Sequence, residues 1–211
     1  MMEKYFEYGK KELDYLKNKD KRLKEVIENV GMIKRKIDPD LFVSLIYTII
    51  GQQISTKAHQ TVWQRFVDKH IYITPETISS SDIETIQSCG MSYRKASYVL
   101  GAAQKAASGE LDIEALYDMT DEEILKSLTS LNGIGIWTAE MLMLFSMGRM
   151  DIFSYGDLAI HRGLKIIYRH RKVPRELFEK YRRRYSPYGS VASLYIWAAA
   201  GGALEQIAEL P

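Results

Sequence analysis

Hydrophobic residues recur every three to four positions along most of the chain, the spacing that places them on one face of an α-helix. This pattern predicts short helices after Thr74-Pro75 and over 82–87 and 124–128, and longer ones over 3–16, 21–30, 40–50, 56–69, 93–107, 136–147, 158–168, 175–184 and 190–200. Strand-like alternation is confined to 70–74. We therefore expect an all-α protein of short helices and tight connections.

Polar residues stand where several of these helices should begin. Ser55, Ser92 and Asp157 are favoured N-cap types, and Thr120 with Glu123 has the spacing of a capping box. Asp38 is expected to cap a helix that starts at Pro39, since proline suits the first helical turn.

The stretch LNGIGIWTAE, residues 131–140, combines two glycines with a helix start. Gly133 and Gly135 allow a tight turn and a close approach of the backbone to another molecule. The first N–H groups of the next helix lie at the positive end of its dipole, which favours an anion such as a nucleic-acid phosphate. The chain lacks the residues of a nucleotide P-loop or a dinucleotide fingerprint here. The alternative is a helix–helix turn without a ligand.

Composition and charge limit the kinds of protein that this chain can be. The 211 residues are 46% hydrophobic and 27% charged, typical of a globular protein, with a net charge of +2. Lys and Arg are concentrated from His161 to Arg184, which suggests a polyanion-binding face or, alternatively, a solvated helix face. A single cysteine, Cys89, excludes a disulfide framework and a four-cysteine metal or iron–sulfur site within the chain. The start has no apolar signal core and no apolar run is long enough to span a membrane, so we expect a cytoplasmic protein.

Five segments resemble those of the helix-hairpin-helix DNA glycosylase superfamily, especially the DNA-3-methyladenine glycosylase II branch. In chain order they are IIGQQIS (49–55), GMSYRKA (90–96), the glycine hairpin, the Asp151–Ile160 run and SPYGSVASLYIW (186–197). Asn132 replaces the proline usual before the first hairpin glycine. Some relatives also carry an N-terminal α/β domain, which we expect this chain to lack.

The resemblance implies two helical lobes with a cleft between them. One lobe would span residues 38–150, and the other would combine 1–37 with 151–211. DNA would lie across the cleft, with the damaged nucleotide flipped into it.

The resemblance also implies that Asp157 is the catalytic carboxylate. It would stabilise an oxocarbenium-like sugar and orient the attacking water. The alternative is that Asp157 only caps the helix that follows it. Asp151 is the second candidate and is expected to be structural.

An alkylated purine carries positive charge, so an aromatic pocket would bind it by stacking and cation–π attraction. The resemblance places Trp137 and Trp197 in this pocket, with Tyr155 as a further candidate. Met141 and Leu158 stand where some relatives have more aromatic residues. The alternative for the tryptophans is core packing.

The resemblance assigns DNA contacts to Gln52 and Gln53, and Gln53 would fill the gap left by the flipped base and hydrogen-bond the orphaned partner base. An exposed turn is the alternative. The other expected DNA-binding residues are Ser92, Arg94, Lys95, Gly133, Ile134, Gly135, Thr138 and Arg162. Family members often hold Na⁺ or K⁺ through hairpin carbonyls, here those of Thr129, Leu131 and Ile134. No other cofactor and no iron–sulfur cluster is expected.

These features predict a monomeric, monofunctional DNA glycosylase of base excision repair that acts on duplex DNA with an alkylated base. It would work in the cytoplasm, at the nucleoid in a prokaryote. Trp137 stands where bifunctional relatives have a lysine, so no strand cleavage is expected. Two alternatives remain: a glycosylase for deaminated, oxidised or mismatched bases, and a non-catalytic DNA-binding protein.

Overall fold

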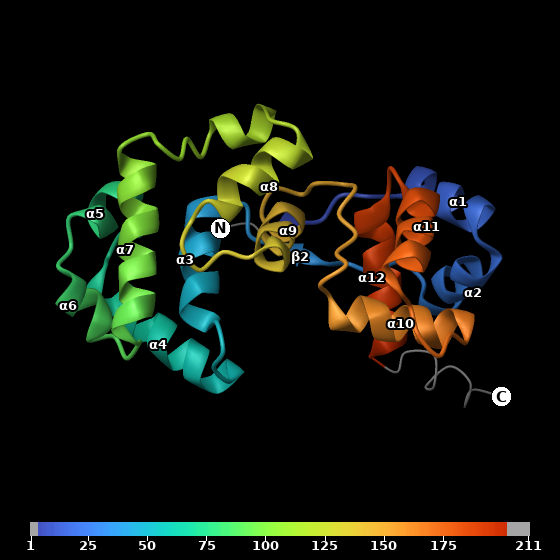
Figure 1. Cartoon of the computed structure of the whole chain (residues 1–211), viewed down its shortest axis with the longest axis horizontal. Coiled ribbons are helices and arrows are strands. Elements are labelled where there is room, and N and C mark those ends of the chain that lie inside the picture. The colour runs from blue at the N-terminus through green and yellow to red at the C-terminus, as the bar shows by residue number, and fades with distance from the viewer. Residues whose placement is uncertain (1–3, 202–211) are drawn as a thin grey trace. The chain divides into compact units, whose positions relative to one another are not determined.

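The computed structural model describes residues 4–201 and confirms the all-α prediction (Figure 1). Across these residues the helices are α1 (Lys10–Lys19), α2 (Lys21–Val30), α3 (Leu41–Gly51), α4 (Thr56–Lys69), α5 (Pro75–Ser79), α6 (Ile83–Gln87), α7 (Tyr93–Ala107), the 3₁₀ turn η1 (Ala115–Asp118), α8 (Asp121–Thr129), α9 (Ile136–Phe145), α10 (Leu158–Tyr168), α11 (Arg175–Tyr185) and α12 (Gly189–Ala200). The described part of the chain has one sheet, an antiparallel pair of two-residue strands, β1 (Lys4–Tyr5) and β2 (Lys36–Ile37). None of the described helices could span a membrane.

The contacts divide the chain into two compact units, which we name the central unit and the terminal unit. The central unit comprises residues 38–142, and the terminal unit comprises the described residues of 1–37 and 143–211. Helix α9 contributes its first seven residues, 136–142, to the central unit and the remainder to the terminal unit.

In the central unit, α7 is the helix against which α5, α6 and α3 pack (Figure 1). Helix α3 also packs on α4, and its side chains are buried on more than one face, including Leu45, Ile46 and Ile49. A helix that is apolar on most sides must be buried, which explains why α3 lies inside the unit. Its C-terminal end carries the polar residues Gln52 and Gln53.

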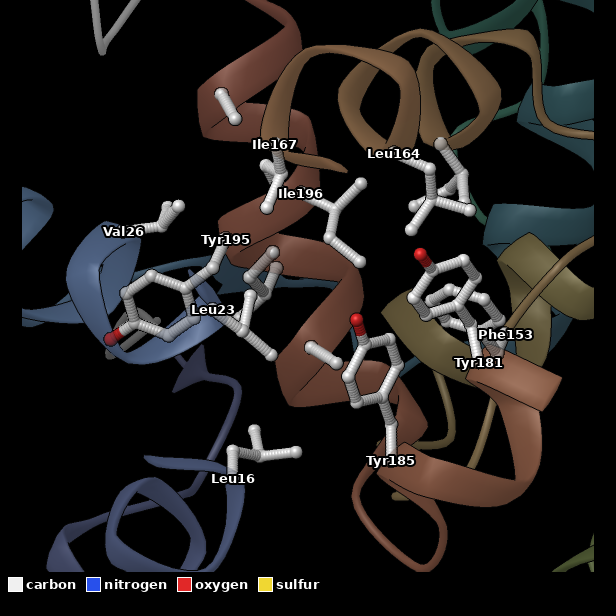
Figure 2. Packing of buried hydrophobic residues seen from close by; sticks show 14 of the residues in the cluster. Leu16, Leu23, Val26, Phe153, Leu164, Ile167, Tyr181, Tyr185, Tyr195 and Ile196 are labelled. Carbon is white, nitrogen blue, oxygen red and sulfur yellow. The ribbon is translucent and has the colours of Figure 1, made fainter. Parts of the chain in front are cut away.

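In the terminal unit, α10 packs against α12, and both contact α2. Figure 2 shows the core among these helices, where Leu23, Leu164 and Ile196 lie beside buried tyrosines. Gly163 of α10 makes the crossing possible, because a Cβ atom there would lie 2.2 Å from the Ile196 carbonyl oxygen. This close crossing holds α10, whose N-cap is Asp157, against α12.

Local signals located most helix ends correctly. Helices α2, α4, α7 and α10 have the predicted bounds. Ser55 and Ser92 accept hydrogen bonds from the N–H groups of Ala58 and Lys95, and Thr120 with Glu123 forms the predicted capping box.

Three local predictions were wrong. Helix α1 begins at Lys10 rather than residue 3, because residues 4–5 pair with 36–37, a non-local contact that helical spacing does not reveal. The N-cap of α3 is Asp40, whose Oδ1 accepts from Val43 N, whereas Asp38, two residues earlier, accepts from Asp40 N. Residues 70–74 form a bend and no strand.

Candidate DNA-binding and catalytic site

The hairpin turn of the central unit depends on Gly133. Its φ is +85°, which favours glycine, and a Cβ atom there would lie 2.5 Å from the Tyr98 ring. Ile134 N donates to Leu131 O at 3.1 Å, which closes the turn. Gly135 differs, because nothing lies within 4 Å of its would-be Cβ atom and its φ is outside the left-handed region. Gly135 therefore leaves open space in front of the N-terminus of α9.

The turn after α3 contacts this hairpin. Gln52 Nε2 donates to the Gly133 carbonyl oxygen at 2.8 Å, across 81 positions of sequence. Gln53 has a φ of +57°, a left-handed backbone that non-glycine residues rarely adopt. The two predicted DNA-contacting turns are thus joined within one unit.

Lys95 of α7 is directed at the same turn. Its Nζ donates to the carbonyl oxygens of Ile50, at 2.9 Å, and Gln52. Desolvation by the surrounding protein lowers the pKa of Lys95. The amine that we expected at a DNA phosphate is therefore bonded to backbone of the central unit, while Arg94 beside it is exposed.

These segments enclose a hollow of about 480 Å³. It brings together the GQQIS turn, the start of α7 and the hairpin, as its lining residues show: Ile50, Gln52, Gln53, Ile54, Val62, Gly90, Met91, Ser92, Arg94, Lys95, Tyr98 and Gly133. Three of the five recognised sequence segments thus form one continuous surface.

Asp157 is buried at the N-terminus of α10 in the terminal unit, with 6% of its surface exposed. Its Oδ1 accepts from Ala159 N at 2.8 Å and from Ile160 N at 2.9 Å, so the predicted cap is present. The positive end of the helix dipole favours negative charge at this place. Capping fixes the orientation of the carboxylate without excluding a chemical role.

The loop before Asp157 is held by aromatic contacts. The Tyr155 ring packs edge-on against Phe178 and His161, and the Arg175 guanidinium lies 4.5 Å from its centroid. His161 Nε2–H donates a hydrogen bond to the Tyr155 carbonyl oxygen at 2.8 Å. Tyr155, two residues before Asp157 in sequence, therefore contributes to the packing of the terminal unit.

Trp197 on α12 is half-buried and stacks on Phe145, with ring centroids 5.6 Å apart and an interplanar angle of 27°. The Arg35 guanidinium lies 4.4 Å from the Phe145 ring centroid. Neither Phe145 nor Arg35 was among the predicted site residues. The hydrophobic pattern of the helix identifies Phe145 as apolar, but it cannot reveal contacts with residues as distant in sequence as Arg35 and Trp197.

The other predicted site residues differ in how far they are exposed to solvent. Trp137 and Leu158 are 48% and 84% exposed, so neither is ordinary core, whereas Met141 is partly buried and Thr138 is buried. Arg162 is exposed on α10. Asp151 Oδ1 accepts from Gly189 N at 3.0 Å and its Oδ2 from Ser186 Oγ, so this carboxylate fastens the start of α12.

No group of three His, Cys, Asp or Glu side chains suited to a metal occurs within residues 4–201. The expected ligands at the hairpin are instead backbone carbonyl oxygens. Such oxygens are hard donors of the kind that suits Na⁺ or K⁺.

Comparison with known proteins identifies the family. Residues 46–187 match the HhH-GPD superfamily of base excision DNA repair proteins. The chain is 30% identical over 182 residues to DNA-3-methyladenine glycosylase 1 of Schizosaccharomyces pombe, covering 84% of this chain and 80% of that protein.

Solved structures give the same result. The fold is similar to the crystal structure of a DNA-3-methyladenine glycosidase from Bacillus halodurans, with a TM-score of 0.88, 33% identity and coverage of 96% and 95% of the two chains. A 3-methyladenine DNA glycosylase of S. pombe in complex with abasic DNA has a TM-score of 0.74 and 30% identity, with coverage of 90% and 96%. The chain belongs to the HhH-GPD superfamily of base excision DNA repair proteins.

Proposed function

We propose that this protein is a DNA glycosylase that excises alkylated bases, of the 3-methyladenine type, from duplex DNA. The observation that carries the proposal is the buried Asp157 carboxylate, held by two backbone N–H groups at the start of α10. Similarity to 3-methyladenine glycosylases along nearly the whole chain supports the choice of substrate. The protein acts as a monomer in the cytoplasm, at the nucleoid in a prokaryote.

Asp157 performs the electrostatic part of the reaction. As the bond between the sugar C1′ and the base nitrogen breaks, its electron pair leaves with the base and positive charge develops on the sugar. A fixed carboxylate in a water-poor site stabilises that charge. Water oriented by Asp157 then adds to C1′ and transfers a proton to this carboxylate, which passes it to solvent, leaving an abasic site.

The base pocket uses the chemistry of the substrate. An alkylated purine is cationic and leaves without much protonation, so aromatic faces that stabilise the cation suffice. From the resemblance we assign such faces to Trp197 and Tyr155 of the terminal unit, with Leu158, and to Trp137 of the central unit, with Met141. The Phe145 ring stacked on Trp197 supports the indole from behind.

The DNA backbone is held mainly by the hairpin. Gly133 and Gly135 present N–H groups to a phosphate, Ile134 between them closes the turn, and Thr138 lies in the first turn of α9. Ser92, Arg94 and Arg162 add polar and basic contacts, and Gln53 fills the gap left by the flipped base. Na⁺ or K⁺ held by the carbonyl groups of Thr129, Leu131 and Ile134 would add positive charge near this phosphate.

Base removal is the only covalent step that we propose. Strand cleavage by bifunctional relatives requires an amine that attacks the sugar, and Trp137 stands at the corresponding position. Borohydride added during turnover should therefore trap no protein–DNA adduct, and nicks should appear only after alkali. A trapped adduct that disappears when one lysine is mutated would contradict the proposed branch.

The substrate is tested directly by incubating the protein with duplexes that contain 7-methylguanine, 3-methyladenine or hypoxanthine and identifying the released base by mass spectrometry. We expect release of methylated purines. Release of deaminated or oxidised bases alone would favour the other glycosylase class. DNA binding without any base release would favour a non-catalytic protein.

A further inference from the structure

Helix α7 supports both DNA-contacting turns of the central unit from one face. Lys95 and Tyr98 are three residues apart, so they lie on the same side of the helix. Lys95 Nζ donates to carbonyl groups at the end of α3, and the Tyr98 ring lies beneath Gly133 of the hairpin. One turn of α7 thus contacts two segments that are about eighty residues apart in sequence.

A direct hydrogen bond closes this arrangement. The Gln52 amide donates to the Gly133 carbonyl oxygen, so the turn and the hairpin are bonded to each other as well as to α7. We call Lys95, Gln52, Gly133 and Tyr98 the brace. Gln53, the next residue, projects from this braced turn with its left-handed backbone. Such a conformation persists only where the surrounding structure fixes it.

The chemistry of Lys95 suits this task better than phosphate binding. The last carbonyl groups of a helix lack intrahelical partners and lie at the negative end of its dipole. The Lys95 ammonium supplies donors and positive charge to two of these groups, Ile50 O and Gln52 O. Burial lowers the pKa of Lys95, in keeping with an amine withdrawn from solvent. Its neighbours Tyr93 and Arg94 are exposed.

We propose that Lys95 is a positioning residue that fastens the Gln53 turn to α7, where the Gln52 amide bonds that turn to the hairpin, so that the gap-filling side chain and the phosphate-binding turn meet DNA in a fixed register. This inference rests on the proposed function of both turns. It predicts an effect on base flipping rather than on phosphate binding. Without the Lys95 amine, the hairpin still holds DNA but Gln53 no longer enters the helical stack at the correct place.

The variant Lys95→Met removes the amine at nearly constant length, and Lys95→Arg keeps donors for the two carbonyl groups. The matched control is Lys105→Met, which removes another cation of α7, one that pairs with exposed Glu110. Gln52→Met removes the bond to Gly133 and tests the brace independently should Lys95→Met fold poorly.

Three measurements distinguish positioning from a general loss of structure. Single-turnover excision of 7-methylguanine is compared between a fully paired duplex and one in which the lesion faces an abasic site, where flipping is easy. Affinity is measured on a duplex with a tetrahydrofuran abasic analogue. Fluorescence of 2-aminopurine opposite that analogue reports insertion of a side chain into the stack.

For Lys95→Met we expect excision from the paired duplex to fall roughly 10- to 100-fold, as for other small misplacements in enzyme sites. Excision of the unpaired lesion and DNA affinity should change much less, and the 2-aminopurine signal at saturation should be lost. Lys95→Arg should restore most of the rate, Gln52→Met should resemble Lys95→Met, and Lys105→Met should match the wild type.

Equal losses on paired and unpaired lesions, or a normal 2-aminopurine signal in both Lys95→Met and Gln52→Met, would overturn the inference. The proposed function fails separately, if the wild type releases no alkylated base. The 2-aminopurine measurement requires no excision, so it tests the brace even then.

Discussion

The two hairpin glycines should respond differently to the same substitution. In Gly133→Ala, the added methyl group would require a left-handed alanine and displacement of the Tyr98 ring, which lies 2.5 Å from the new atom. In Gly135→Ala, the methyl group would meet no protein atom within 4 Å. One glycine is therefore needed for folding of the turn, and the other leaves room for DNA.

The magnitudes follow from these contacts. A left-handed backbone costs alanine about 1–2 kcal/mol, and overpacking against the partly buried Tyr98 ring adds about 1–3 kcal/mol. We therefore expect Gly133→Ala to lower the free energy of unfolding by about 2–5 kcal/mol. Gly135→Ala should change it by less than about 1 kcal/mol, because its backbone is not strained.

Urea denaturation measures the free energy of unfolding, and fluorescence anisotropy with an abasic duplex measures DNA affinity. Gly135→Ala should keep wild-type stability yet bind DNA of any sequence more weakly, because its methyl group keeps the phosphate away from the turn. Wild-type affinity in Gly135→Ala, or equal stability of the two variants, would refute this division of roles.

Three further predictions concern packing, pH and salt. Gly163→Ala should lower the free energy of unfolding by about 1–3 kcal/mol in urea melts, since its methyl group would meet the Ile196 carbonyl in the α10–α12 crossing. Burial lowers the pKa of His59. The hydrogen bond to the Tyr47 carbonyl raises this pKa and the Lys95 charge lowers it, but burial is the largest effect. When the pH falls below about 6.5, the ordinary pKa of histidine, His59 binds a proton more readily in the unfolded chain than in the folded one, so the free energy of unfolding should decrease. Melts at several pH values should show a weaker dependence of stability on pH in His59→Gln. The logarithm of the DNA association constant should decrease linearly with the logarithm of salt concentration. A complex whose affinity does not depend on salt would argue against phosphate binding.

Local chemistry made much of the fold predictable. Ser55 and Ser92 marked helix starts because a cap acts on N–H groups two or three residues away. The first helix was misplaced because Lys4 and Tyr5 pair with a strand about thirty residues later. Periodicity along one segment contains no information about such a partner.

In the candidate site, too, contacts between residues far apart in sequence could not be predicted. Its segments were recognisable, since Gly133 and Asp157 stand in distinctive sequence patterns. The use of Lys95 was not, because its amine bonds to carbonyl groups 43 and 45 positions away, and carbonyl groups leave no side-chain signature. Arg35 was missed for a similar reason, as its partner Phe145 belongs to a distant helix.

The central claim is that Asp157 carries out chemistry beyond capping α10. Asp157→Asn separates the two roles, because asparagine caps helices as well as aspartate and keeps an oxygen for Ala159 N and Ile160 N. The decisive measurement is the single-turnover rate of methylated-base release by this variant. We predict wild-type melting behaviour and DNA affinity with a loss of roughly 100-fold or more in rate, the scale of removing one electrostatic group from an active site. Base release at the wild-type rate by a folded Asp157→Asn protein would contradict the account.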